Sequence, residues 1–326
     1  MRQSTTILVT GFFMLCACIE TTSRRENQEA PATQTPISTD GEEVISLLGK
    51  VFRELPLSDS ERSKRERELM EARTAYETDP DKLENIIWFG RRLAYLGHFK
   101  EAIRIYSVGL DKYPDSYKLL RHRGHRYITL RKFDQAIEDL QKAAFYARPH
   151  QNEIEPDGIP NRINRPLSNT KFNIWYHLGV GFYLKGNYDK AISSFKKCME
   201  FADNDDLKVA VTDWFYMTYK KIGNNAAAEQ LLTPINQRMR IIENSAYLDR
   251  LLMYKGTLSA EKLLNRAQSG DESIEPTLGY GIGNWYAYNG RLDDAREVLF
   301  RITVGPRWDS FGFIAAEVDL LSLKDL

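Results

Sequence analysis

A repeat of about 34 residues is the sequence feature that most constrains how this chain can fold. Three segments, residues 86–114, 120–149 and 175–202, each place a glycine twelve residues before an alanine. The pairs are Gly90 and Ala102, Gly124 and Ala136, and Gly179 and Ala191. The first two alanines are 34 residues apart. Because a unit of this length cannot bury its apolar face alone, the period predicts units that stack on one another.

Apolar and small side chains recur at helical spacing inside each segment. In the third segment, one stripe is formed by Trp175, Leu178, Gly179 and Phe182, and a second by Ala191, Phe195 and Cys198. Offsets of 0, 3, 4 and 7 put a stripe on one face of a helix. This series resembles the tetratricopeptide repeat (TPR), a helix–turn–helix unit. The resemblance implies an all-α fold, a right-handed α-solenoid of TPR-like helix pairs.

Weaker matches extend the array toward the C-terminus. They are Gly223 with Ala228, Gly256 with Ala260, and Gly290 with Ala295. We therefore expect a solenoid of about six units over residues 83–326, with residues 308–323 as its C-terminal capping helix. Residues 42–82 precede it as N-terminal helices, over Glu42–Leu55 and Glu61–Thr78, the second with Ser60 as its N-cap.

One insertion interrupts the period. Ala136 and Ala191 are 55 residues apart, and the extra segment lies near residues 150–170. A loop of this length in a compact array is usually functional or disordered. The spacing of Ile154, Ile159, Ile163 and Leu167 predicts a loop pinned to the body. The insertion also carries four polar donors, Asn161, Arg162, Asn164 and Arg165. They predict a rim that contacts a ligand. The alternative is a lid whose arginines pair with nearby acidic residues.

The N-terminus indicates export. Arg2 precedes an apolar run from Ile7 to Cys18, which as a helix would span about 18 Å, short of a bilayer core of about 30 Å. Residues 1–17 therefore predict a signal peptide. Leu15–Cys18 resembles the bacterial lipobox, which implies lipidation of Cys18, and Ile19 after it favours the outer membrane. The alternative is an ordinary signal peptide that contains a cysteine.

Residues 18–41 are rich in Thr, Gln, Pro and charge, so we expect a disordered tether after the lipidated cysteine. The whole then predicts a lipid-anchored membrane protein of the bacterial cell envelope. Lys and Arg number 45, and Asp and Glu also number 45, which argues against a nucleic-acid binder held by phosphate attraction. No residue pattern indicates catalysis, a metal or a cofactor, so we expect a protein that is not an enzyme.

The resemblance also implies a partner-binding groove, because first helices line the concave face in that family. The side chains off the apolar stripe that we expect there are Arg91, Tyr95, Arg121, His125, Tyr176, Tyr183, Asp213, Met217, Tyr280, Asn284 and Tyr288. Tyr and Arg are enriched at binding hot spots. The favoured function is a membrane-tethered TPR scaffold for a protein or peptide partner. The alternative is a solute- or carbohydrate-binding lipoprotein that uses the 150–170 loop and the groove tyrosines.

Overall fold

The structure is a computed structural model that describes Met1, residues 43–269 and residues 273–323. The chain divides into two units, Met1–Ser38 and Thr39–Leu326, and every element below belongs to the second. The predicted signal peptide, Cys18 and the tether lie outside the described residues. The helices are α1 (Asp59–Thr78), α2 (Leu83–Tyr95), α3 (Phe99–Lys112), α4 (Tyr117–Thr129), α5 (Phe133–Tyr146), α6 (Thr170–Leu184), α7 (Tyr188–Met199), α8 (Asp205–Lys221), α9 (Asn225–Leu232), α10 (Ser245–Tyr254), α11 (Ala260–Ala267), α12 (Pro276–Tyr288), α13 (Leu292–Thr303) and α14 (Phe311–Leu323).

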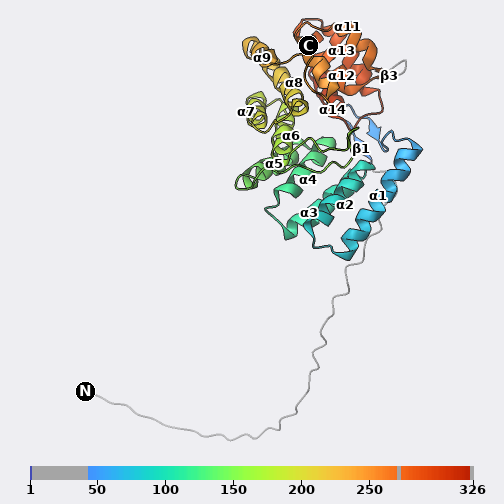
Figure 1. The fold of residues 1–326 in the computed structure, drawn as a ribbon, viewed down its shortest axis with the longest axis vertical. Helices are drawn as coiled ribbons and strands as arrows, with labels where there is room; N and C mark the ends of the chain where they lie inside the picture. The colour runs from blue at the N-terminus through green and yellow to red at the C-terminus, as the bar shows by residue number, and fades with distance from the viewer. Residues whose placement is uncertain (2–42, 270–272, 324–326) are drawn as a thin grey trace. The chain divides into compact units, whose positions relative to one another are not determined.

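Five helix pairs pack in succession in the described part of the chain, α2 with α3, α4 with α5, α6 with α7, α8 with α9 and α12 with α13, whereas α11 packs mainly on α12 and not on α10. Figure 1 shows their succession, from the blue-green α2 to the orange α13. The second helix of one pair packs against the first helix of the next, as α3 on α4, α5 on α6 and α7 on α8. The prediction of an all-α solenoid of TPR-like pairs is confirmed.

Glycines on the first helices explain how closely the two helices of a pair approach. A Cβ atom on Gly90 would lie 2.3 Å from the Tyr106 ring, and one on Gly179 would lie 2.4 Å from the Phe195 ring. Both rings are buried. The aromatic side chain of the second helix therefore occupies the space that any larger residue on the first helix would need.

The predicted helix over Glu42–Leu55 is wrong. The chain there forms two antiparallel strands, β1 (Val44–Ile45) and β2 (Val51–Phe52), in which Val44 pairs with Phe52. Gly49 closes the turn between them with a φ of 81°. A second small hairpin, β3 (Gln268–Ser269) with β4 (Ser273–Ile274), lies between α11 and α12.

The helix expected after this segment begins earlier than predicted. Ser58, not Ser60, is the N-cap of α1: its side chain accepts from the Glu61 backbone N–H, and the Glu61 carboxylate accepts from the Ser58 N–H. Two otherwise unpaired N–H groups are satisfied by this reciprocal arrangement, which accounts for the start at Asp59.

The last helix, α14, ends the solenoid and is buried along most of its length. It packs against α12 and α13 and also contacts α6, the first helix of the third pair. Phe313, Ile314 and Ala315 are buried, and so are the charged Glu317 and Asp319. The helix therefore fills the inside of the curved array. No helix in the described ranges combines the length and apolarity needed to cross a bilayer.

Candidate functional site

The first helices of successive pairs contact one another along the inner face, α2 with α4, α4 with α6, α6 with α8, α8 with α10 and α10 with α12. In addition, α12 contacts α8, and α14 contacts α6. The inner face thus turns back on itself, and side chains predicted to line an open groove face each other across it.

Tyr183, Tyr280 and Asn284 are the clearest case. The Tyr183 and Tyr280 hydroxyls are 2.7 Å apart, and Tyr280 also donates to Oδ2 of Asp319 on α14 at 3.0 Å. Asn284 donates to the same carboxylate oxygen and accepts from the Tyr288 hydroxyl at 2.7 Å. Burial raises the pKa of Tyr183 and Tyr280 well above the ordinary tyrosine value. These hydroxyls are neutral hydrogen-bond partners of one another.

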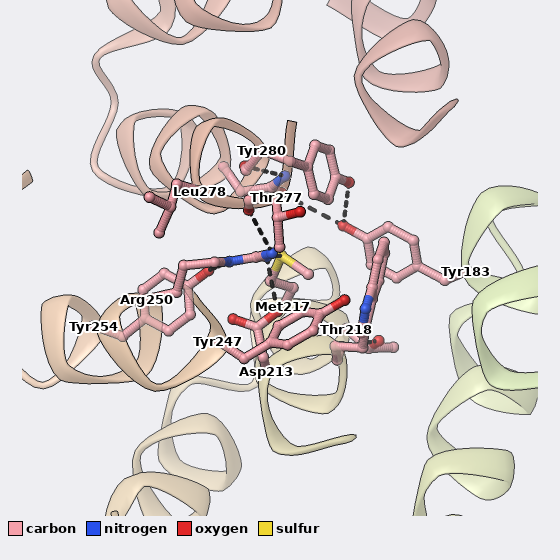
Figure 2. A network of polar contacts seen from close by, with 12 residues as sticks. Tyr183, Asp213, Met217, Thr218, Tyr247, Arg250, Tyr254, Thr277, Leu278 and Tyr280 are labelled. Atoms are coloured by element: carbon pink, nitrogen blue, oxygen red, sulfur yellow. Dashed lines mark hydrogen bonds and ion pairs between the residues drawn. The ribbon is translucent and has the colours of Figure 1, made fainter. Parts of the chain in front are cut away.

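Asp213 and Met217 are fully buried beneath Arg250, as Figure 2 shows. Nη2 of Arg250 lies 2.8 Å from Oδ2 of Asp213 and 3.0 Å from the Met217 sulfur, and Nη1 donates to the Thr277 carbonyl at 2.9 Å. The ion pair lies off the hydrogen-bond direction, so neither Asp213 oxygen accepts an aligned hydrogen bond. Burial raises the pKa of Asp213 to about 7, although Arg250 opposes that shift.

The prediction of an open groove is therefore wrong for the part between α6 and α14. Tyr176 is buried as well, with its hydroxyl 3.1 Å from that of Tyr247. The physical reason is the tight curvature of the array, because polar side chains brought together out of water must satisfy one another. Half-buried Tyr288 contributes to this interior through Asn284.

Arg91 and Arg121, from α2 and α4, lie under the insertion. Nη2 of Arg91 donates to the Pro156 carbonyl at 2.7 Å, and its Nε donates to the Tyr95 hydroxyl at 3.2 Å. Nη2 of Arg121 forms an ion pair of 2.9 Å with Glu155. These contacts fix the first part of the insertion, residues 155–158, on the inner side of the first two helix pairs.

The insertion, residues 147–169 between α5 and α6, is thus pinned to the body, although by other residues than predicted. A Cβ on Gly158 would lie 1.8 Å from the Tyr95 hydroxyl, so the loop backbone sits directly on that ring. The isoleucines expected to anchor it are exposed instead, Ile154 by 57%, Ile159 by 58% and Ile163 by 44%. Backbone carbonyls and the carboxylates of Glu153 and Glu155, which bond Lys118 and Arg121, hold this loop in place of the predicted isoleucines.

The polar residues predicted for the rim divide into two groups. Asn161 is half-buried and structural: its Oδ1 accepts from the backbone N–H of Ile163 and Arg165, and its amide donates to Glu243. Arg162, Asn164 and Arg165 are exposed. Asn164 takes a left-handed φ of 50°, which asparagine tolerates better than most residues.

His125 is half-buried between α4, α6 and α14. Its ring lies 4.3 Å from that of His177 and 5.2 Å from that of Phe311. Burial, followed by the charge of a neighbouring arginine, holds the pKa of His122, His125 and His177 well below the ordinary histidine value. The three imidazoles are therefore neutral at pH 7.

Two adjoining cavities lie on this side, and they share Ala94, Tyr95, His125 and Arg126. The outer one holds about 280 Å³ and the inner one about 110 Å³. Of the predicted groove residues, Arg91, Tyr95, Arg121 and His125 line them. An accessible hollow thus lies on the inner side of the first two helix pairs.

Sequence reasoning missed several residues that organise the inner face. They are Arg126, Glu155, His177, Arg250, Glu317 and Asp319. One signal was available, since Arg126 lies one turn beyond His122 on the face that points inward. The other residues come together only through contacts between distant repeats, which local periodicity does not encode. Within the described residues, no group of three or more His, Cys, Asp or Glu side chains is placed to hold a metal ion.

The described fold defines an all-α protein of stacked TPR-type helix pairs. In agreement, the tetratricopeptide repeat family matches residues 172–205, which include most of α6 and all of α7. The BBSome complex member BBS4 of Bos taurus is 30% identical over 129 residues, 39% of this chain. That match spans only 21% of the relative's length.

Solved structures show likenesses of the same kind. MamA is 22% identical, with a TM-score of 0.40, over 53% of this chain and 88% of that chain. YrrB, described as a TPR protein with an unusual peptide-binding site, is 16% identical, with a TM-score of 0.41, over 78% of this chain and 98% of that chain.

Proposed function

We propose that this protein is a TPR-type binding scaffold that holds a protein or peptide partner at the bacterial cell envelope. The proposal joins the stacked helix pairs to the export signal and to lipidation of Cys18, both of which rest on the sequence. An acyl anchor would keep the partner at a high effective concentration near the membrane.

One observation carries the choice of binding surface: Ile154, Ile159 and Ile163 are exposed on a loop whose backbone is held in place. Large apolar side chains gathered on one fixed segment are typical of an interaction surface, because water solvates them poorly. The inner face from α6 onward, in contrast, is occupied by its own side chains. We therefore assign partner binding to these three isoleucines, called the isoleucine rim below.

Matched variants test this assignment. Ile154, Ile159 and Ile163 are changed together to serine, and the intact protein is crosslinked in its own cells. The control changes three side chains of nearly equal exposure on other elements, Val108, Phe145 and Ile222, exposed by 45%, 58% and 43%. The proposal predicts that the rim variant loses a specific protein adduct that the control keeps. Retention of that adduct by the rim variant would contradict it.

The anchor is tested separately. Replacement of Cys18 by serine is expected to abolish incorporation of radiolabelled palmitate and to release the protein from the membrane fraction. A serine variant that remains membrane-bound and labelled would remove the anchor from the proposal without affecting the isoleucine rim.

A further inference from the structure

Arg126 on α4 is a half-buried cation without a hydrogen-bond or ion-pair partner among the described residues. Its guanidinium lies over the Phe99 ring, 5.5 Å from the ring centroid, and lines both cavities. Burial lowers the pKa of Arg126, yet a guanidinium stays charged at pH 7. Partial loss of hydration makes such a charge costly unless an opposite charge approaches it.

Arg121 adds a second unfilled donor in the same hollow. Its side chain is only 9% exposed, and its Nη2 and Nη1 are used by Glu155 and His122. Its Nε, however, is buried without an acceptor. Since nearly all buried donors in folded proteins are paired, an empty one next to a cavity indicates a missing acceptor.

The side chains that line the inner cavity carry more positive than negative charge, and a further carboxylate, Asp157, lies near Arg91 outside this lining. Three guanidinium groups line the cavity, from Arg91, Arg121 and Arg126, with a single carboxylate, Glu155, which is paired with Arg121. Arg91 bonds neutral groups, the Tyr95 hydroxyl and the Pro156 carbonyl. The histidines lining the cavity are neutral at pH 7, as described above.

The outer cavity does not supply the missing negative charge. Its two carboxylates are already engaged, Asp309 with Arg307 at 3.2 Å and Glu61 with Ser58 at the start of α1. A further guanidinium, that of Arg65, lines this cavity and donates to the Tyr95 carbonyl at 2.7 Å.

We propose that the hollow between α2, α4 and the insertion binds a small organic anion, whose carboxylate or phosphate group enters the inner cavity between Arg121 and Arg126. Guanidinium groups bind both kinds of oxyanion through paired N–H donors. The inner cavity, at about 110 Å³, has room for one such group. The outer cavity offers Leu55, Phe99 and Ile159 to the less polar body of the ligand.

The size of the hollow restricts the ligand. At about 280 Å³, the outer cavity lies near the lower end of the range of about 300–1,000 Å³ that small-molecule sites occupy. The site is distinct from the isoleucine rim, apart from Ile159, which lies at its mouth. Anion binding and partner binding can therefore succeed or fail independently.

Thermal unfolding of the full-length chain tests the proposal, with inorganic phosphate and acetate as the probes. Each is added at constant ionic strength against chloride, so that general screening is held fixed. At about a hundredfold excess over its dissociation constant, the preferred anion is expected to raise the unfolding midpoint by about 5 °C. If only phosphate, or only acetate, raises the unfolding midpoint, that result identifies the oxyanion that the site binds.

Variants separate this site from nonspecific effects. Arg126→Met is expected to abolish the shift, whereas Arg238→Met, at an exposed arginine between α9 and α10, is expected to keep it. If Arg126→Met does not fold, Arg126→Lys is used instead, because lysine keeps the positive charge but lacks the paired N–H donors of a guanidinium group. It is expected to weaken anion binding about tenfold. The proposal is overturned if neither anion exceeds chloride, or if the Arg126 variants retain the full shift.

Discussion

Arg131, in the turn of the second helix pair, forms a buried two-point ion pair with Glu317 on the last helix, 186 residues later. The two N···O distances are 2.9 and 3.1 Å. Nη2 of Arg131 also donates to the Trp308 carbonyl at 3.0 Å. This pair joins an early repeat to the end of the chain and closes the inner face.

Arg131 has a left-handed backbone conformation, which is uncommon for a residue other than glycine. Arg131 has a φ of 59°, and Gly97, one 34-residue period earlier, has a φ of 93°. A left-handed conformation costs a non-glycine residue about 1 kcal/mol. The arginine side chain offsets that cost through its contacts with α14.

Breaking this ion pair should destabilise the protein strongly. Arg131→Gly relaxes the backbone but leaves Glu317 buried and unpaired, so we expect a net loss of about 3–5 kcal/mol in the free energy of unfolding. The double variant Arg131→Gly with Glu317→Leu should recover much of that loss because no charge is left buried. Urea denaturation followed by circular dichroism measures both.

The control for this prediction is an exposed ion pair. Lys142→Gln breaks the contact with Glu138, where both side chains are more than half exposed, and should cost less than about 0.5 kcal/mol. Equal losses for Lys142→Gln and Arg131→Gly would contradict the closure of the array by Arg131 and Glu317.

A methyl group at Gly179 should separate the helices of the third pair. Gly179→Ala places a Cβ 2.4 Å from the Phe195 ring, and overpacking of this kind costs about 1–3 kcal/mol. Phe195→Leu in the same chain should restore part of the loss by making room. If the double variant is no more stable than Gly179→Ala alone, as measured by thermal unfolding, the close approach is not the cause.

The fold could largely be predicted from the sequence, because close helix contacts depend on local spacing. Gly179 and Phe195 lie within one repeat, and their positions already indicate a ring against a glycine. The N-terminal strands could not be predicted in the same way. Phe52 stacks on Trp308 at 5.3 Å, and the Trp308 indole donates to the Glu54 carbonyl. That support comes from the far end of the chain.

The candidate site was predictable only in part, for a related reason. The repeat register placed Arg91, Tyr95, Arg121 and His125 on the inner face, where they line the hollow. It also placed Tyr280 there, but the curvature of the array determines whether such a side chain meets a ligand or another repeat. Small rotations accumulate from pair to pair, so no single repeat encodes the closure.

Acid should destabilise the protein partly through its buried histidines. The pKa of His177 is held well below its ordinary value by burial and by Arg121. Near pH 6.5, His177 therefore binds a proton in the unfolded chain but not in the folded chain. The free energy of unfolding is highest above that pH and decreases as the pH falls. The loss is about 1.4 kcal/mol per pH unit for each such group.

The His177→Gln variant isolates this effect. Between pH 7 and pH 5.5, the free energy of unfolding should fall more for the wild type than for His177→Gln, as measured by urea denaturation. A pH-independent difference for His177→Gln would contradict the assignment.

A larger side chain at position 158 should release the insertion. Gly158→Ala forces the loop off the Tyr95 hydroxyl, which lies 1.8 Å from the new Cβ position. Trypsin cleavage after Arg162, followed by mass spectrometry, should become faster by about tenfold because local opening exposes the loop. Tyr95→Ala in the same chain removes the ring and should restore protection; unchanged cleavage in Gly158→Ala would show that the loop is not held there.

The central claim is that a partner reaches the isoleucine rim and not the closed inner face. Site-specific photo-crosslinking in the native cells compares the two directly, with the photoreactive amino acid in place of exposed Ile159 or of buried Tyr183. The account predicts a discrete protein adduct from position 159 and none from position 183. An adduct from position 183 alone would mean that the array opens to bind inside, and would contradict the account.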